Sequence, residues 1–544
     1  MSDSVRAARV GPPSPDGIAS QAELFATQGR FAEAERMLAA ALEASPGDER
    51  LLSTLIRIRM TQGRAAEAGE TLDRAIGAGA KLTAGLLRLR GGLLLSQARF
   101  DDAVEMFRQA VAAEPDDASA EHALAIALGR TGTHEAAIAA ARRAIAKGHD
   151  PVAARLVLAR ALWDHDRVDE AETEFRRVVD LQPTHVTAHT NLADAIWMRT
   201  GDLAASTAAL DAAIASAPRA PDLRLLKARL LEGTGYPERA YAEIAHGLAF
   251  APNHVELHLG AARASIAFDA ERSLAHAEHA LRLSPSPQGA LALFADASLA
   301  NGHAARAATA AERLLQIDPD DGHAIAVLAS AWRLAGDSRY RTLYDYANFV
   351  RVQTLDTPDG WPDLASWLAD LARALHRRHD AMRAHPIAQT LRSGTQVMLH
   401  IERDAEPAIR ALRDAIGGPI ERYLAALGRG TDRLRRRNTG RWQLADFWSV
   451  RLRGSGHHFN HYHGSGWLSS ACYIELPPLA NGQGWLQFGM PCMPTRPALG
   501  PDYFVEPEAG QLVLFPSWMW HGTVPFVAKP GMSRLTIAFD VLPA

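Results

Sequence analysis

The chain has 544 residues, of which 22% are charged and 47% are hydrophobic, and its formal net charge is −4. A chain of this length is too long for one hydrophobic core, so we expect two or more domains. A net charge this close to zero gives no overall attraction to nucleic acid or to an anionic membrane, and we expect neither as a partner.

Residues 1–14 are polar and contain proline, and we expect them to be disordered. The stretch up to Gly17 lacks the apolar segment of a signal peptide, and no run of about 18 apolar residues occurs farther along the chain. The only cysteines are Cys472 and Cys492, too few for a disulfide framework and typical of a reducing compartment. We therefore expect a cytoplasmic protein without a membrane anchor.

Residues 15–344 contain an internal repeat. Glycines recur at spacings of 34, 69, 69, 34, 67 and 34 residues, which are single or double steps of one period. These glycines are Gly29, Gly63, Gly132, Gly201, Gly235, Gly302 and Gly336. A small residue recurs with the same period, five positions after the turn, at Ala34, Ala68, Ala103, Ala137, Ala171, Ser206, Ala240 and Ala307. Prolines close many units, at Pro46, Pro115, Pro183, Pro218, Pro252, Pro285 and Pro319.

Each feature of the repeat has a physical cause. Glycine permits the left-handed conformation that ends a first helix, the small residue lets two helices approach closely, and proline cannot continue the second helix. The period and the pattern resemble the tetratricopeptide repeat (TPR), a helix–turn–helix unit. We expect an all-α superhelical solenoid whose groove binds a protein or a peptide. A spacer or a dimerisation scaffold is the alternative.

Residues 345–440 are expected to be a helical region that links the solenoid to the next domain and supports it. Helical patterns cover residues 344–350, 361–376 and 406–427, the last with an interruption at Gly417-Gly418.

Residues 441–544 alternate in the manner of β-strands. The predicted elements are strands at residues 442–452, 468–476, 511–515 and 534–541, a turn and strand at 482–488, and a turn at Gly454–Gly456. His461 and His463 occupy positions i and i+2 of one extended segment, so their side chains share a face. By the same period, His457 shares that face and His458 lies opposite.

Two further residues complete a candidate site. His521 lies 60 residues after His461, beside another predicted strand, and Arg534 follows 13 residues later at the start of the terminal strand. Imidazoles from two strands leave open positions on a metal, and neutral imidazole suits iron, zinc and copper. The guanidinium fork of an arginine binds an anionic co-substrate. The sequence therefore predicts a metal site with an anion-binding group beside it.

At these residues the end of the chain resembles the 2-oxoglutarate/Fe(II)-dependent dioxygenases, and more narrowly those with an H-x-H…F-P-S…H…R pattern that are often fused to TPR repeats. The resemblance implies a double-stranded β-helix, or jelly roll, and the cofactors Fe(II), 2-oxoglutarate and O2. His461 and His521 match the iron ligands of the family. Arg534 matches the arginine that binds the C5 carboxylate of 2-oxoglutarate, and Thr536 matches the hydroxyl residue two positions later.

His463 departs from the wider superfamily, whose H-x-D/E motif has a carboxylate here. Three interpretations stay open: His463 is a third ligand, which we favour; water or chloride fills the position, as in the similar aspartyl/asparaginyl β-hydroxylases; or the site is degenerate. The hydroxyl of Tyr473 either bonds to 2-oxoglutarate or lies in the core. Trp518 and Trp520 either wall the site off from water or pack at the barrel mouth. The segment His385–Gln396 resembles an H-P-x-x-Q-S-L-R-G-G-T-Q signature of TPR-fused members, and either packs as a helix against the jelly roll or faces the substrate.

We therefore expect a 2-oxoglutarate- and Fe(II)-dependent dioxygenase that hydroxylates a protein or peptide recruited by the TPR array. One alternative is a TPR adaptor whose jelly roll is catalytically inactive. Another is an oxygenase for a small molecule, in which the repeats serve only assembly.

Overall fold

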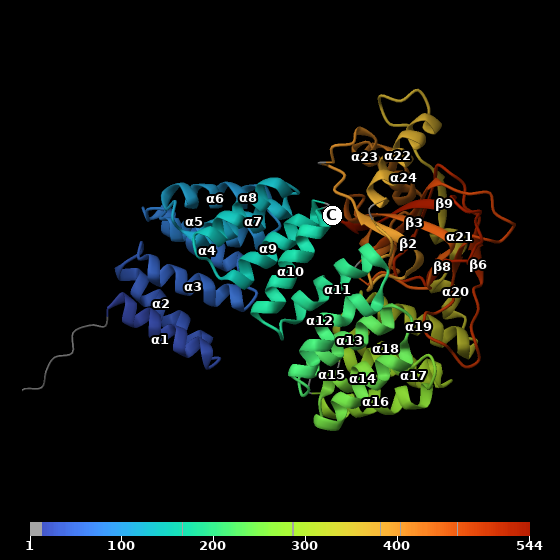
Figure 1. The fold of residues 1–544 in the computed structure, drawn as a ribbon, viewed down its shortest axis with the longest axis horizontal. Coiled ribbons are helices and arrows are strands. Elements are labelled where there is room, and N and C mark those ends of the chain that lie inside the picture. Colours follow the sequence, from blue (N-terminus) through green and yellow to red (C-terminus); the bar gives the residue numbers. More distant parts are fainter. Residues whose placement is uncertain (1–13, 166, 285–287, 381, 403, 465) are drawn as a thin grey trace, which may run out of the picture. The chain divides into compact units, whose positions relative to one another are not determined.

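The computed structural model describes residues 14–165, 167–284, 288–380, 382–402, 404–464 and 466–544. The chain divides into two compact units, Met1–Pro183 and Thr184–Ala544, and each is described by itself. The stretch expected to be disordered, residues 1–14, lies outside the described residues except for Ser14. As predicted, an array of helical repeats comes first in the sequence and a region of antiparallel sheet comes last (Figure 1).

The first unit consists of helices that pack in consecutive pairs (Figure 1). They are α1 (Pro15–Thr27), α2 (Phe31–Ala44), α3 (Glu49–Thr61), α4 (Ala65–Gly77), α5 (Ala84–Ser96), α6 (Phe100–Ala113), α7 (Ala118–Arg130), α8 (His134–Ala146), α9 (Pro151–Asp164) and α10 (Val168–Leu181). The predicted turn glycines adopt the left-handed conformation, with φ of 75° at Gly29 and 73° at Gly63 and Gly132. The small residues that follow them are fully buried, at Ala34, Ala68, Ala103, Ala137 and Ala171.

Ala98 forms the third turn of the array, where the repeat has no glycine. Its φ is 58°, in the left-handed region that costs a residue with a Cβ atom roughly 1 kcal/mol. We expect Ala98→Gly to raise the free energy of unfolding of the first unit by about 0.5 kcal/mol, since relief of strain exceeds the added freedom of the unfolded chain. Gly132→Ala, at the equivalent turn, is expected to lower it by about 1 kcal/mol. Urea denaturation measures both changes, and a less stable Ala98→Gly variant would contradict this account.

The second unit begins with more repeats of the same kind. Their helices are α11 (Val186–Thr200), α12 (Leu203–Ser216), α13 (Pro221–Gly233), α14 (Pro237–Phe250), α15 (Val255–Ser265), α16 (Ala270–Leu283), α17 (Gln288–Ala300), α18 (Ala304–Ile317) and α19 (Gly322–Ala335). Left-handed glycines again stand at the turns, at Gly201, Gly235, Gly302 and Gly336. Pro218, Pro252 and Pro319 each follow the end of a second helix, whereas Pro285 lies outside the described residues.

Further helices follow the repeats and alternate with the first strands of the sheet region. They are α20 (Arg339–Leu343), α21 (Tyr346–Phe349), α22 (Leu364–His379), α23 (Pro407–Arg410), α24 (Leu412–Leu427) and the 3₁₀ turn η1 (Arg435–Arg437). The predicted interruption at Gly417-Gly418 is wrong, because α24 continues through both residues. A Cβ atom on Gly418 would lie 2.0 Å from a carboxylate oxygen of Asp356, so this glycine permits a close contact and does not end the helix. No described helix is both long and apolar enough to cross a membrane.

Two antiparallel sheets make up the end of the chain (Figure 1). Their strands are β1 (Arg351–Thr354), β2 (Leu391–Met398), β3 (Trp442–His458), β4 (Leu468–Glu475), β5 (Leu486–Phe488), β6 (Tyr503–Val505), β7 (Gln511–Pro516), β8 (His521–Thr523) and β9 (Ser533–Pro543). The larger sheet has the order β1-β7-β4-β9-β3-β2 and the smaller one β6-β5-β8. The strands predicted at 468–476, 511–515 and 534–541 are confirmed as β4, β7 and β9. The segment 385–396 contains the start of β2, so a helix at this position is wrong.

The turn predicted at Gly454–Gly456 is also wrong, because β3 continues to His458. These residues form a bulge instead: on β2, Gly394 pairs with Leu452, whereas Arg392 pairs with His457. Gly454 has a φ of 55°, which lets the chain bend within the strand. A bulge and a turn use the same residue types, so composition alone did not distinguish them.

The sheet region packs directly against the last repeat helix. The indole N–H of Trp520 donates to the Ala326 carbonyl at 3.2 Å and to the Ser330 hydroxyl at 3.0 Å, both on α19. Tyr344 accepts a hydrogen bond from the Trp520 backbone at 3.0 Å and donates to the Trp518 carbonyl at 3.1 Å. Trp520 is therefore a packing residue between sheet and repeats, and does not wall off the site.

His379, at the end of α22, is a buried histidine away from the predicted site. Its ring lies between the hydroxyls of Thr395 at 2.8 Å and Ser449 at 3.0 Å. Burial, and then the positive charge of Arg451, lowers the pKa of His379 to about 3. Between pH 6.5 and about 3 the unfolded chain binds a proton that the native protein excludes, so this group makes stability fall as the pH falls.

We expect His379→Gln to flatten the loss of stability between pH 7 and pH 5, because glutamine keeps hydrogen-bonding groups but takes up no proton. Thermal unfolding midpoints at pH 7, 6 and 5 measure how steeply stability depends on pH. The control is His303→Gln, because His303 is an exposed histidine in the turn before α18. An unchanged slope in His379→Gln would show that other groups dominate acid unfolding.

Candidate metal centre and its pocket

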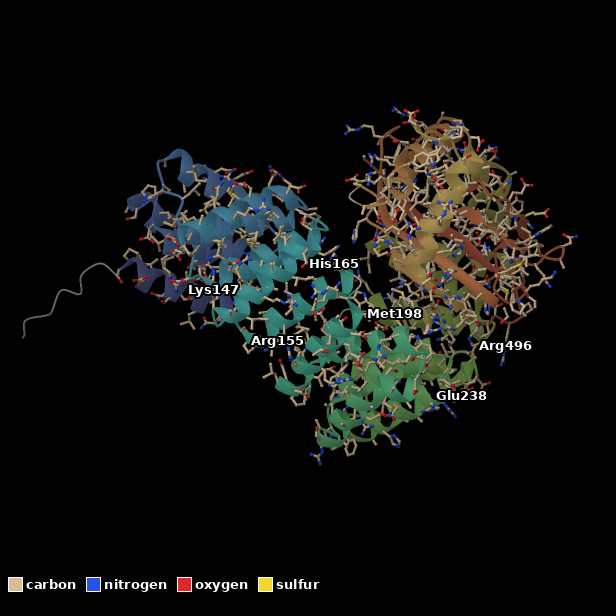
Figure 2. All side chains as sticks on the ribbon, turned by 45° about the horizontal axis from the view of Figure 1, so that its top comes forward. Lys147, Arg155, His165, Met198, Glu238 and Arg496 are labelled. Atoms are coloured by element: carbon tan, nitrogen blue, oxygen red, sulfur yellow. The ribbon has the colours of Figure 1, made fainter. Side chains whose placement is uncertain are left out.

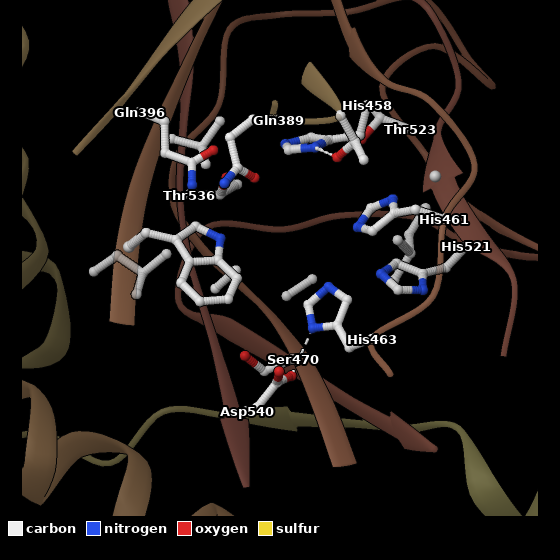
Figure 3. A pocket seen from close by; sticks show the side chains of 18 of the residues that line it. Gln389, Gln396, His458, His461, His463, Ser470, His521, Thr523, Thr536 and Asp540 are labelled. Atoms are coloured by element: carbon white, nitrogen blue, oxygen red, sulfur yellow. Dashed lines mark hydrogen bonds and ion pairs between the residues drawn. The ribbon is translucent and has the colours of Figure 1, made fainter. Parts of the chain in front are cut away.

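Three histidines meet where the chain beyond β3 runs beside the loop that leads into β8 (Figure 3). The backbones of His461 and His521 exchange two hydrogen bonds, of 2.8 and 2.9 Å, as an isolated antiparallel bridge. The backbone N–H of His463 donates to the Ser517 carbonyl at 2.9 Å. The predicted F-P-S…H segment is thus paired to the H-x-H segment, and this pairing places all three imidazoles on one side.

One ring nitrogen of each histidine is within 4.8 Å of the others. The Nδ1 atoms are occupied: His461 donates to the Phe459 carbonyl at 2.8 Å, His521 to the Met519 carbonyl at 2.9 Å, and His463 to the Asp540 carboxylate at 2.7 Å. Because a carbonyl can only accept, Nδ1 carries the proton in His461 and His521, and the lone pair is on Nε2. This arrangement, with the outer nitrogen held by an oxygen, is typical of metal-binding histidines.

The surroundings keep two of these rings neutral. Burial, and then the charge of His463, lowers the pKa of His461 to about 3. Burial also lowers the pKa of His521 well below its usual value. Neutral imidazole is the form that binds a metal, so at neutral pH these residues need release no proton.

Asp540 lies behind His463 and was not predicted from the sequence. Its carboxylate accepts the Nδ1 hydrogen bond of His463 (Figure 3). At 2.7 Å it also accepts a hydrogen bond from the Ser469 hydroxyl. It is 3% exposed, so these bonds fix both its position and the orientation of the His463 ring. Asp540 comes from β9, 77 residues after His463, and the period-two face of this strand that includes Arg534 also includes Asp540.

We expect Asp540→Asn to weaken Fe(II) binding by about 10- to 100-fold, because the His463 ring loses a charged acceptor that orients it and makes its Nε2 a stronger donor. Anaerobic Fe(II) titration measures the affinity. Asp359→Asn, in an exposed loop, makes the same chemical change away from the site. Equal affinities in the two variants would exclude a role for Asp540 in the metal site.

The histidines open into a pocket of about 330 Å³, named the metal pocket here, with Arg534 and Thr536 from β9 also in its wall (Figure 3). Arg534 is 3% exposed and has no carboxylate partner among the described residues; its side chain donates to the Thr523 hydroxyl at 3.4 Å. The guanidinium carbon lies 5.1 Å from the ring centroid of Tyr473. Tyr473 is fully buried and is outside the pocket wall, but its hydroxyl has no hydrogen-bond partner among the described residues, so both roles proposed for this residue stay predictions.

His458 also lines the metal pocket, which corrects the predicted orientation of the two preceding histidines. Its ring centroid lies 5.8 Å from that of His461, and its Nδ1 lies 3.2 Å from the Thr390 hydroxyl. His457 instead stacks edge-on against Phe459, at 5.1 Å. The alternation fails because β3 ends at His458, and the chain changes direction before His461.

The segment 383–391 connects the metal pocket to the repeats. The backbone N–H groups of Arg383 and Ala384 donate to the carbonyl of Met198, on α11, at 2.8 and 3.1 Å (Figure 2). The indole of Trp197 donates to the His385 carbonyl at 2.9 Å. Farther along the segment, Gln389 lines the pocket (Figure 3). One short stretch therefore contacts both a repeat helix and the pocket. Its residues form no helix that packs against the sheet region, and the substrate-facing role stays a prediction.

Comparisons with known proteins agree with this organisation. Residues 446–540 match the family described as "Putative 2OG-Fe(II) oxygenase", and residues 25–88 and 156–221 match two tetratricopeptide repeat families. Residues 96–178 match the family of the anaphase-promoting complex, cyclosome, subunit 3. The chain thus combines TPR repeats with a domain of this oxygenase family, as its sequence predicts.

No curated protein sequence matches the chain. Solved structures that are similar to part of it include the following two. A tetratricopeptide repeat protein from Parabacteroides merdae ATCC 43184 has 18% identity and a TM-score of 0.35; the match covers 46% of this chain and 98% of that one. A structure described as MamA RS-1 ArsTM double mutant has 16% identity and a TM-score of 0.28, covering 31% of this chain and 94% of that one.

Proposed function

We propose that the protein is a 2-oxoglutarate- and Fe(II)-dependent dioxygenase that hydroxylates a protein or peptide recruited by its repeats. The observation that carries this proposal is the convergence of three Nε2 lone pairs beside a buried arginine that has no carboxylate partner among the described residues. A metal ion would accept the lone pairs of the histidines, and an anionic co-substrate bound to that metal would pair with the arginine.

The donor set fits Fe(II). His461, His463 and His521 would hold the metal, with the remaining positions open for ligands from outside the protein. His463 takes the place of the carboxylate found in the wider superfamily, and the Asp540 carboxylate contributes negative charge on the far side of the His463 ring, through a hydrogen bond to Nδ1. When bound, Fe(II) and 2-oxoglutarate would supply O2 activation and hydroxylation, with succinate and CO2 as the products of the co-substrate.

The pocket also fits a small dicarboxylate. Burying a cation such as Arg534 without an anion is costly, and a bidentate carboxylate recovers that cost. The hydroxyls of Thr523 and Thr536 lie in the same wall and are able to donate to the other oxygens of such an anion. Leu486 and Ile537 add apolar surface to the pocket, beside polar residues such as Gln389 and Gln396.

A polypeptide substrate is supported by the repeats and by the segment 383–391, which contacts both α11 and the metal pocket. TPR arrays present extended binding surfaces, and a chain held there can reach the pocket along this segment. Cytoplasmic location belongs to the same proposal, on the grounds of cysteine content alone.

The test is formation of succinate and CO2 by the full-length protein with Fe(II), 2-oxoglutarate and O2, with and without a pool of peptides. Succinate above the level given by His521→Ala, increased by the pool, supports the proposal. Protein that binds Fe(II) but forms no succinate with any pool would instead support a TPR adaptor. Stimulation by small molecules but not by peptides would support the small-molecule alternative.

A further inference from the structure

A second cavity of about 650 Å³ lies beside the metal pocket, within the second unit. One wall comes from α15, α17 and α19, the first helices of three successive repeats, and the other comes from the sheet region. Tyr462, the residue between the two histidines of the H-x-H motif, lines both this cavity and the metal pocket. The two spaces are therefore neighbours on either side of the metal-binding segment. We name the second one the acidic cavity.

Three carboxylates line the acidic cavity: Asp296 on α17, and Asp318 and Asp321 in the turn before α19. Among the described residues that line it there is one arginine, Arg263, and that guanidinium is paired with Glu232 at 2.6 Å. The charge of the lining is thus negative, and its single full cation is already neutralised.

His323 reports the sign of the potential in the acidic cavity. Its Nε2 lies 2.9 Å from the Asp296 carboxylate, and its Nδ1 has no hydrogen-bond partner among the described residues. Burial alone lowers the pKa of a histidine, yet the pKa of His323 is raised, because the charges of Asp296 and Asp321 outweigh the burial. The carboxylates therefore stabilise a positive charge placed among them.

Apart from Gln288 and Cys492, the rest of the described lining is apolar or aromatic. The Tyr462 ring packs edge-on against Trp520 at 5.1 Å and lies 5.6 Å from the His323 ring. Leu293 and Met493 complete the apolar surface. Such a wall suits a long aliphatic stem, with a cationic end that reaches the carboxylates and the ring faces.

We infer that the acidic cavity binds a lysine or arginine side chain of the polypeptide substrate, a few residues from the residue that enters the metal pocket. That the ligand belongs to a polypeptide substrate rests on the proposed function. That this cavity is the binding site rests on its size, its negative charge and the wall it shares with the metal pocket. The three repeat helices would then select the sequence that is hydroxylated, and would do so beside the metal.

The test uses metal-free, full-length protein, so that its outcome does not depend on the iron chemistry. Peptides are selected from a random display library on the wild type, and one selected peptide is compared with its lysine→norleucine or arginine→norleucine analogue by fluorescence anisotropy. We expect a basic residue at a fixed position among the selected peptides, and an approximately 10-fold loss of affinity in the analogue.

The matched variants are Asp296→Asn and Asp318→Asn, alone and together. In Asp296→Asn the amide oxygen is still able to accept a hydrogen bond from His323, and in Asp318→Asn it is still able to accept one from the Asp320 backbone N–H. Each variant therefore removes mainly the negative charge. In the double variant the two peptides should bind within about 2-fold of each other. Glu238→Gln, at the exposed start of α14, is the control and should keep the full difference (Figure 2).

Two outcomes would overturn the inference: selected peptides without a preferred basic position, or an analogue that loses the same affinity in the double variant as in the wild type. If Asp296→Asn fails to fold, Asp318→Asn alone should still reduce the difference, since it leaves the His323 pair intact. Peptides that satisfy this test but give no succinate would refute the oxygenase function and leave the binding site standing.

Discussion

Replacement of His521 by alanine is expected to abolish both Fe(II) binding and formation of succinate from 2-oxoglutarate. Structural zinc sites with four protein ligands are worth roughly 10–16 kcal/mol, so one ligand is worth roughly 2.5–4 kcal/mol, or about 70- to 900-fold in affinity. His521 is 6% exposed, and its backbone bridge to His461 remains in the variant, so the fold should persist. Anaerobic Fe(II) titration and a succinate assay measure the two effects.

The matched control is His457→Ala. This histidine stands four residues before His461 but is outside the metal pocket, so its variant should bind Fe(II) as the wild type does. His463→Ala then separates two arrangements. We expect it to lose the visible absorption band of the Fe(II)–2-oxoglutarate complex, since His463 is oriented like the other two ligands. A band that persists would mean that two histidines suffice, and retained Fe(II) binding in His521→Ala would contradict the whole site.

The cluster of three histidines and the arginine near it could be predicted because their spacing is local or strand-based. His461 and His463 are two residues apart, His521 follows the clearly alternating strand β7, and Arg534 lies at the start of the clearly alternating strand β9. The turn glycines were predictable for a similar reason, since a left-handed turn admits few other residues. Ala98 is the exception that a glycine pattern cannot reveal, because the repeats on either side impose the turn.

What the sequence could not provide depends on contacts between distant segments. Asp540 orients His463 across 77 residues, and only the pairing of β9 with β4 brings it there. Trp520 looks like part of the site because it adjoins His521, yet its indole is bonded to α19. The acidic cavity needs three repeat helices and the back of the H-x-H segment together, and no single stretch of sequence encodes it.

Arg534 should have opposite effects on stability and on binding. In the protein without ligand its guanidinium is buried, and among the described residues only neutral groups, the hydroxyl of Thr523 and the ring of Tyr473, lie against it. Arg534→Met removes an uncompensated buried charge while keeping most of the side-chain volume. We expect the free energy of unfolding of the ligand-free protein to rise by about 1 kcal/mol or more, as when buried ions are replaced by apolar residues.

The same variant should bind 2-oxoglutarate at least about 30-fold more weakly, because truncating one partner of a buried, hydrogen-bonded charge pair costs roughly 2–5 kcal/mol. Its KM for 2-oxoglutarate should rise while Fe(II) binding is kept, which separates it from the histidine variants. Arg313→Met, on the exposed face of α18, is the control for loss of one positive charge. A residue needed only for packing would give lower stability in Arg534→Met with an unchanged KM. If Arg534 serves to bind an anionic co-substrate, its variant should make the ligand-free protein more stable and the binding of 2-oxoglutarate weaker, because the buried guanidinium is unpaired until that anion binds.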